Sequence, residues 1–172
     1  MAEPISIIRN IIIKEMDLKP DRIWIYNADA PLPKDSGLFC ILSLNAQNPF
    51  SNNVKYEGNF EDDTLNEVQT MNIQADITVS LLSKDDSARS RAYEVQMALG
   101  STYSQQMQEK NRMHISRIGN VVDASFLEAT SRLNRFDVDC VALYAYKKVK
   151  PVDYYDKFPI DSMLRPEIKI EP

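Results

Sequence analysis

The stretch that decides the fold is MNIQADITVSLLSKDDSARSRAYEVQMALG, residues 71–100. In its first half every second residue from Met71 to Leu81 is apolar and the residues between them are polar, which is the period of a half-buried strand. Ser83 and two acids follow, and such side chains favour a helix start because they accept from its first N–H groups and face the positive end of its dipole. We therefore predict a long strand that turns directly into a helix beginning near Asp86.

The second half of this stretch has the period of a helix. Its apolar residues recur at helical spacing, namely Ala88, Ala92, Val95 and Leu99. Gly100 is expected to end the helix in the left-handed conformation that glycine adopts readily. A strand followed by a packed helix indicates a folding nucleus and carries no catalytic signature.

A second long alternating strand is predicted over residues 132–148. One face is apolar and comprises Phe136, Val138, Cys140, Ala142, Tyr144 and Tyr146. Antiparallel pairing of this strand with the first would form the centre of the sheet.

The rest of the chain predicts shorter elements. An apolar stripe and two flanking prolines indicate a helix over residues 4–16, and continuous apolar runs indicate strands over 22–27 and 38–44. A further strand is predicted over 112–118, followed by a turn at Gly119 and Asn120. Residues 101–111 have a weak helical pattern, and 125–130 fit a turn of helix or a loop.

Two polar or proline-rich regions lack a regular period. Residues 45–63 predict a long exposed loop or a hairpin excursion. Residues 149–172 contain four prolines and a cluster of aromatic residues, which favours an extended tail that lies on its own domain or reaches a partner.

The fold class that follows is α+β. We expect one domain over residues 1–148, with a mainly antiparallel or mixed sheet flanked by an N-terminal and a central helix, and the extended tail over 149–172. A chain of 172 residues with 44% hydrophobic and 26% charged residues is long and apolar enough for one core. The isoleucine-rich N-terminus is too short and too often charged for a membrane span or a signal peptide, so we expect a protein made in the cytoplasm.

The net charge of −5 is unevenly distributed. Residues 57–85 hold seven acids and one lysine, a local charge of −6. Such a surface argues against tight binding of nucleic acid, because affinity for phosphate comes mainly from Lys and Arg. It is compatible with nucleic acid passing nearby.

Motifs of catalysis and cofactor binding are absent from the sequence. It has one histidine, two cysteines in apolar runs and four glycines, so it predicts no zinc site, no phosphate loop and no cofactor. The best catalytic candidates are three carboxylates, Asp76, Asp137 and Asp139, which could face one another on paired strands and bind Mg²⁺. The alternative, which we favour, is that they lie on the solvated face of a one-sided sheet.

Three stretches together resemble the tail-terminator or neck-terminator proteins of tailed bacteriophages. They are residues 22–27 with Pro31 and Pro33 after them, residues 76–80 leading into the helix over 86–100, and residues 132–146. The resemblance covers roughly residues 5–147. It implies a non-enzymatic virion protein, assembled in the host cytoplasm, that forms a hexameric ring at the head–tail junction, ends the growth of the tail tube and contacts the head connector.

Two sets of residues are candidates for the surfaces of such a ring. The acids that could face the channel, past which DNA would slide without being held, are Glu57, Glu61, Asp62, Asp63 and Glu67. The candidates for subunit or partner contacts are Ile7, Ile11, Tyr154, Tyr155 and Phe158, together with residues 45–63. For the isoleucines, burial within the domain is the alternative, and it is the one that we favour.

Two other functions remain open at this point. One is another structural component of the phage tail or baseplate. The second is a metal-dependent hydrolase that uses Asp76, Asp137 and Asp139.

Overall fold

The computed structural model describes residues 3–26, 35–59, 64–128 and 131–152. The chain divides into two compact units: unit 1 comprises Met1–Asn53 and Thr70–Tyr146, and unit 2 comprises Val54–Gln69 and Lys147–Pro172. Three long strands contribute residues to both units. They are β2 (Phe39–Asn59), β3 (Thr64–Ser83) and β6 (Ser131–Val152).

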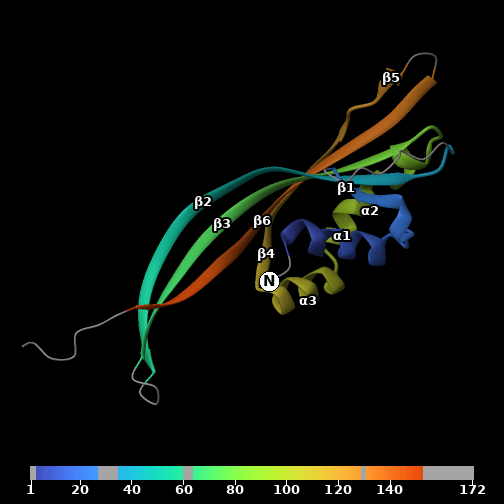
Figure 1. Cartoon of the computed structure of the whole chain (residues 1–172). Coiled ribbons are helices and arrows are strands. Elements are labelled where there is room, and N and C mark those ends of the chain that lie inside the picture. The colour runs from blue at the N-terminus through green and yellow to red at the C-terminus, as the bar shows by residue number, and fades with distance from the viewer. Residues whose placement is uncertain (1–2, 27–34, 60–63, 129–130, 153–172) are drawn as a thin grey trace, which may run out of the picture. The chain divides into compact units, whose positions relative to one another are not determined.

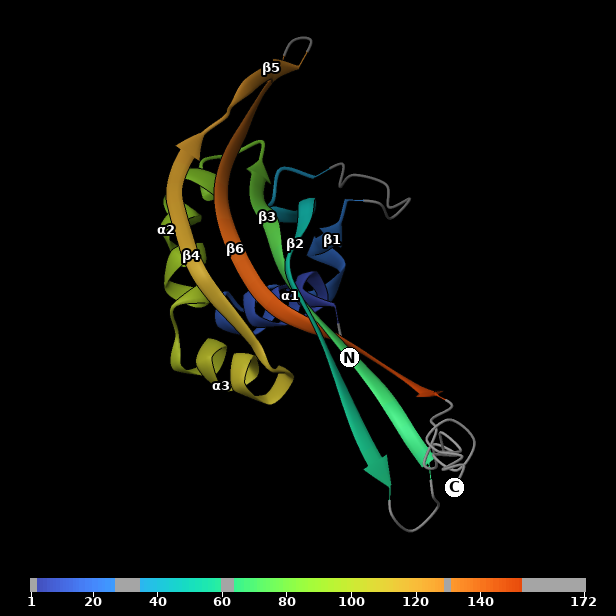
Figure 2. The ribbon, with the colours of Figure 1, turned by 90° about the vertical axis from the view of Figure 1, so that its left-hand side faces the viewer.

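The sheet is mixed and has the strand order β1-β2-β3-β6-β4. The outer strands are β1 (Ile23–Ile25), parallel to β2, and β4 (Met113–Asp123), antiparallel to β6. The arrows of β2, β3 and β6 alternate in direction (Figure 2), so the two long alternating strands are antiparallel neighbours, as predicted. The short strand β5 (Phe126–Glu128) pairs with β6, in a segment that the sequence predicted as a turn of helix or a loop.

Within unit 1, three helices of the described residues cover one face of the sheet (Figure 1). They are α1 (Pro4–Glu15), α2 (Ser87–Leu99) and α3 (Thr102–Asn111), and a short 3₁₀ helix spans Pro20–Arg22. Between helices and sheet lies the core of unit 1. Its fully buried side chains include Ile8, Ile12, Leu42, Ile77, Val79, Leu81, Leu99 and Val138. The predicted α+β class is confirmed.

Helix α1 has a wide buried face because it contacts β1, α2 and α3. Ile7 is 2% exposed and Ile11 is 0% exposed. This burial agrees with the favoured interpretation of the stripe and removes the two isoleucines from the candidates for subunit contacts, since the chain's own core covers them.

The start of α2 follows the predicted pattern, whereas its end does not. The Ser83 hydroxyl accepts from the Ala88 N–H at 3.0 Å, and an Asp85 carboxylate oxygen accepts from the Ser87 N–H at 2.9 Å. Gly100, however, is right-handed, with φ −89°. No left-handed reversal is needed there, because the Ser101 hydroxyl caps α3 immediately by accepting from the Ser104 N–H at 3.0 Å.

Strand β2 corrects the expectation of a loop after Leu44. The polar residues 45–59 continue the strand, in agreement with the alternative prediction of a hairpin excursion. Residues 60–63 lie outside the described part. Polar side chains bond across the ladder: the Asn45 amide donates to the Thr78 hydroxyl at 2.7 Å, and the Asn72 amide donates to the Ser51 hydroxyl at 3.3 Å.

Gly119 lies within β4, where the sequence predicted a turn. The pairing of β4 with β6 shifts register between Ile118 and Val121, so Gly119 and Asn120 form an irregularity of the strand. A Cβ at Gly119 would lie 2.9 Å from the Asp139 carbonyl oxygen. Close approach of two backbones therefore requires glycine at this position.

The predicted tail falls mostly outside the described residues. Residues 149–152 are the end of β6. Tyr154, Tyr155 and Phe158 lie in the segment that the structure does not describe, so a domain boundary at residue 148 stays a prediction.

Candidate assembly surfaces

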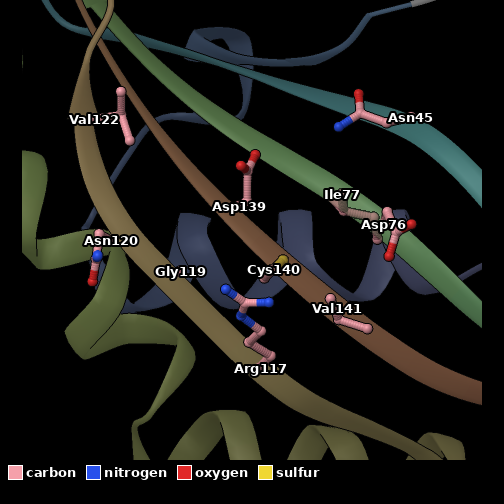
Figure 3. A pocket seen from close by; sticks show the side chains of 10 residues that line it. All are labelled: Asn45, Asp76, Ile77, Arg117, Gly119, Asn120, Val122, Asp139, Cys140 and Val141. Atoms are coloured by element: carbon pink, nitrogen blue, oxygen red, sulfur yellow. The ribbon is translucent and has the colours of Figure 1, made fainter.

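The face of the sheet away from the helices carries a polar hollow in unit 1. Asp139 lies between the buried residues Val138 and Cys140 on β6, so its side chain points to the opposite face of the strand. Figure 3 shows it with Arg117 and Asp76 among the side chains that line this hollow. The hollow has a volume of about 510 Å³. The lining residues are Asn45, Asp76, Ile77, Arg117, Gly119, Asn120, Val122, Asp139, Cys140 and Val141.

The carboxylates of this face are used in bonds between side chains. Asp139 accepts from the Thr78 hydroxyl at 2.5 Å, and Asp76 accepts from the Asn48 amide at 3.3 Å and the Gln74 amide at 3.0 Å. The bonds of Thr78 to Asp139 and of Asn48 to Asp76 tie neighbouring strands together in the same way as cross-strand pairs on other sheets, whereas Gln74 and Asp76 lie on the same strand.

Asp137 has a different partner from the other two acids. Arg135 forms an ion pair with it at 2.9 Å and also donates to the Ser80 hydroxyl at 3.3 Å. In the described part of the chain, no three His, Cys, Asp or Glu side chains form a group that could hold a metal ion. The geometry therefore does not assemble Asp76, Asp137 and Asp139 into the metal site that a hydrolase would need.

The same open face has a small apolar cluster. Trp24 packs edge-on against Phe39, with ring centroids 5.7 Å apart, beside Ile41, Leu82 and Leu133. Trp24 is thus a packing residue of the sheet.

Unit 2 presents the second group of candidate residues. Its described part consists of residues from β2, β3 and β6, and the outer two strands carry exposed apolar side chains. Val54 is 44% exposed, Tyr56 62% and Val149 55%. Large exposed apolar side chains that lie close together are typical of a surface that meets a partner.

The comparison with known families gives a direct assignment. A family model described as phage neck terminator protein matches residues 5–171, nearly the whole chain. The chain belongs to this family. Its members are structural proteins of the bacteriophage neck, and the resemblance noted in the sequence is confirmed. No curated protein matches the chain.

Family membership makes this neck terminator a virion protein that contacts other head and tail proteins. It also places the chain at the neck, which separates it from the baseplate alternative. Within the described ranges, no helix has the length and apolar character to cross a bilayer.

The candidate channel acids of the neck terminator differ in their exposure and in their bonding partners. Glu57 is exposed on β2, and residues 61–63 lie outside the described part. Glu67 is paired with Lys150 at 3.2 Å, its side chain is 12% exposed, and it also accepts from the Gln69 amide at 2.5 Å. The charge of Glu67 is therefore offset within the subunit, which its position in an acidic stretch of sequence did not indicate.

Sequence reasoning also missed a basic feature. Strand β6 brings Lys147, Lys148 and Lys150 into the unit that holds residues 57–67. The signal was present as three lysines within four residues, but the strand pairing that brings Lys150 to Glu67 could not be predicted from the sequence.

Proposed function

We propose that this protein forms a homohexameric ring at the head–tail junction of the virion, ends the growth of the tail tube and joins the tube to the head connector while DNA passes through. The family match over residues 5–171 is the observation that supports this proposal most strongly. A ring built by rotation needs two different complementary surfaces on each subunit.

The proposed partner surface is the aromatic tail with Tyr154, Tyr155 and Phe158. Deletion of residues 149–172 should leave a folded subunit, because the core of unit 1 lies elsewhere, but assembly or docking to the tail should be poor. Circular dichroism reports the fold, and light scattering with isolated tails reports assembly. A deletion variant with the mass and docking of the wild type would refute this role.

The proposed channel surface comprises the acids Glu57, Glu61, Asp62 and Asp63, since a negative wall repels DNA phosphates and lets them slide. Reversal of these four charges to lysine should slow DNA passage while the ring still assembles. Asn52→Lys and Asn53→Lys serve as controls, because they add positive charge at exposed neutral positions of β2, the strand that also carries Glu57. Infectivity equal to that of the wild type would contradict the proposal.

The ring itself is tested by the solution mass over a wide concentration range. We expect a discrete mass of six subunits, either for the protein alone or after tail components are added. Virions assembled without the protein should have tails of uneven length, visible by electron microscopy, because nothing ends the growth of the tube.

Thermal stability in Mg²⁺ or Mn²⁺ separates this function from a hydrolase at Asp76, Asp137 and Asp139. A specific metal site would raise Tm by linkage, since the ion binds only the folded state. We expect no change in Tm for the neck terminator.

A further inference from the structure

The helix layer of unit 1 presents an exposed stripe on the outer face of α2. Asp86, directly before the helix, is followed by Arg89, Tyr93 and Met97 at spacings of three and four residues, so the four side chains share one face. Tyr93 is 67% exposed and Met97 is 73% exposed. Among the described residues, the side chains of Asp86 and Arg89 have no bonding partner. This α2 stripe therefore has two unpaired charges at one end and two uncovered apolar side chains at the other.

The polar hollow on the open face of the sheet also has unpaired charges and an uncovered apolar side chain. Within the described ranges, the Arg117 guanidinium has no bonding partner, and Asp139 accepts only from the neutral hydroxyl of Thr78. Val122 lines the same hollow and is 55% exposed. In the part of the chain that the structure describes, no side chain of opposite charge therefore neutralises either ionic group.

These three groups of the hollow follow one another along the strand direction. Arg117 lies opposite Val141 of β6, and Val122 lies opposite Asp137, so Asp139 is midway between them. At about 3.3 Å per residue of strand, Asp139 lies about 7 Å from Arg117 along this direction, and Val122 lies about 13 Å from it. The hollow thus offers a base, an acid and an apolar side chain in that order.

The α2 stripe offers the complementary groups in the same order. At about 1.5 Å per residue along the axis, its base lies about 5 Å from its acid, and its two apolar side chains lie about 11 Å and 17 Å from that acid. When the stripe is laid along the hollow, acid meets base, base meets acid, and two apolar side chains flank the exposed valine. The facing residues are Asp86 and Arg117, Arg89 and Asp139, and Tyr93 and Met97 with Val122.

We propose that the α2 stripe of one copy docks in the polar hollow of the next copy. This inference rests on the proposed ring and names a contact between its subunits. The stripe and the hollow belong to opposite sides of one sheet, since α2 lies in the helix layer and the hollow on the open face, so a subunit cannot join its own two surfaces (Figure 1). The contact joins two different surfaces, as a cyclic ring requires. It also covers the open face of each sheet with a helix, which is a common layer arrangement of α and β elements.

Reversal of the charges of the first pair tests this contact. Both side chains are exposed and have no bonding partner within the described residues, so the fold should tolerate the changes. Arg117→Glu should raise the midpoint concentration of assembly at least about tenfold, because it places two acids opposite each other. Asp86→Lys should have a similar effect, and the double variant should assemble within about threefold of the wild type. Sedimentation velocity over a concentration series measures the midpoint, with tail components added where the protein alone stays monomeric.

The matched controls reverse two charges on α3, outside both surfaces. Glu109→Lys and Lys110→Glu change the charge by the same amounts, and both residues are exposed without an ion pair in the described part of the chain. Each control should assemble within about threefold of the wild type. Circular dichroism checks that all the variants are folded.

Disulfide trapping tests the apolar end of the contact. Tyr93→Cys combined with Val122→Cys should give a covalent ladder that extends to the full ring under mild oxidation, and Met97→Cys with Val122→Cys tests a second register. Within one copy these side chains point away from each other on opposite sides of the sheet, so any disulfide must join two copies. Tyr26→Cys with Val122→Cys is the matched control: Tyr26 is 72% exposed beside β1, at the other edge of the sheet, and should give no ladder. The two native cysteines are buried and stay in place.

Other outcomes would overturn the inference in distinguishable ways. A wild-type midpoint for Arg117→Glu, or a ring whose cysteine pairs give no ladder, refutes the contact and leaves the proposed ring intact. A wild-type midpoint together with lost docking to tails assigns the hollow to another neck protein. Dimers from single cysteine variants mean a two-fold contact between like surfaces. A monomer under all conditions, tail components included, refutes the proposed ring and this contact together.

Discussion

The two units of this neck terminator use the same three strands in opposite ways. In unit 1 the sheet is covered by three helices, and Val138 on β6 is 0% exposed. In unit 2, eleven residues further along the same strand, Val149 is 55% exposed. Strand formation alone therefore does not make a core, because the covering layer decides whether apolar side chains stabilise the subunit or remain available to a partner.

The comparison is tested most directly by truncating these two valines. Val138→Ala should lower the free energy of unfolding by about 2–3 kcal/mol, because it removes two buried methyl groups and leaves a cavity. Val149→Ala should change it by less than about 0.5 kcal/mol in the isolated subunit. Urea unfolding of both variants measures the difference, and equal losses would mean that unit 2 has a core of its own.

A smaller loss of unfolding free energy is expected when the polar contact of Gln108 inside unit 1 is removed. The buried Gln108 side chain accepts from the Ile115 N–H at 2.8 Å and donates to the Ser104 hydroxyl at 3.0 Å, which ties α3 to β4. Gln108→Leu leaves that backbone donor without its acceptor and should cost about 1–2 kcal/mol in urea unfolding. Gln105→Leu, at an exposed position of the same helix, is the control, and a similar loss there would point to helix propensity instead.

The ion pair between Glu67 and Lys150 in unit 2 should contribute less to the free energy of unfolding. Glu67→Gln removes the pair with Lys150, whose side chain is 48% exposed, and such pairs contribute about 0–1 kcal/mol. The loss should appear in unit 2 alone, as faster amide exchange in residues 64–69 and 147–152. Faster exchange throughout unit 1 as well would show that the two units unfold together.

The smallest effect concerns a surface pair of unit 1 and depends on pH. Arg22 forms a double hydrogen bond with Asp35 and lowers the pKa of that carboxyl from 3.8 to about 2. Since the folded-state pKa is the lower one, the pair stabilises the fold above about pH 4, and this contribution disappears as the pH falls towards 2. Asp35→Asn should lower Tm slightly at pH 7, and its difference from the wild type should vanish near pH 2.

The sequence predicted the regular elements of unit 1 well because their periods are strong. The alternation from Met71 to Leu81 and the apolar spacing of α2 follow directly from burial on one face. Strand β2 beyond Leu44 was predicted less well, since asparagine is depleted in strands and only the partner strand reveals that Asn45 can bond to Thr78. Gly119 looked like a turn residue because the local sequence does not show that the backbone of β6 approaches it closely in the folded chain.

The candidate surfaces were harder to predict than the fold. A wide apolar stripe on a helix has the same sequence whether a subunit or its neighbour covers it, so Ile7 and Ile11 could not be assigned before their burial was known. Glu67 shows the same limit for charge, because its partner Lys150 lies far along the chain. In both cases, the burial of the isoleucines and the charge of Glu67, the outcome depends on contacts between segments that are far apart in the sequence.

The two buried cysteines bear on how a released virion ages. Burial raises the pKa of the Cys140 thiol to about 12 and that of Cys40 still further above its usual range. The thiolate is the form that peroxide attacks, and these thiols are both protonated and out of reach of solvent. A particle that persists in oxygenated surroundings thus holds, in each copy of this subunit, two cysteine sulfur atoms that oxidants attack slowly, and these two thiols should stay reduced during storage.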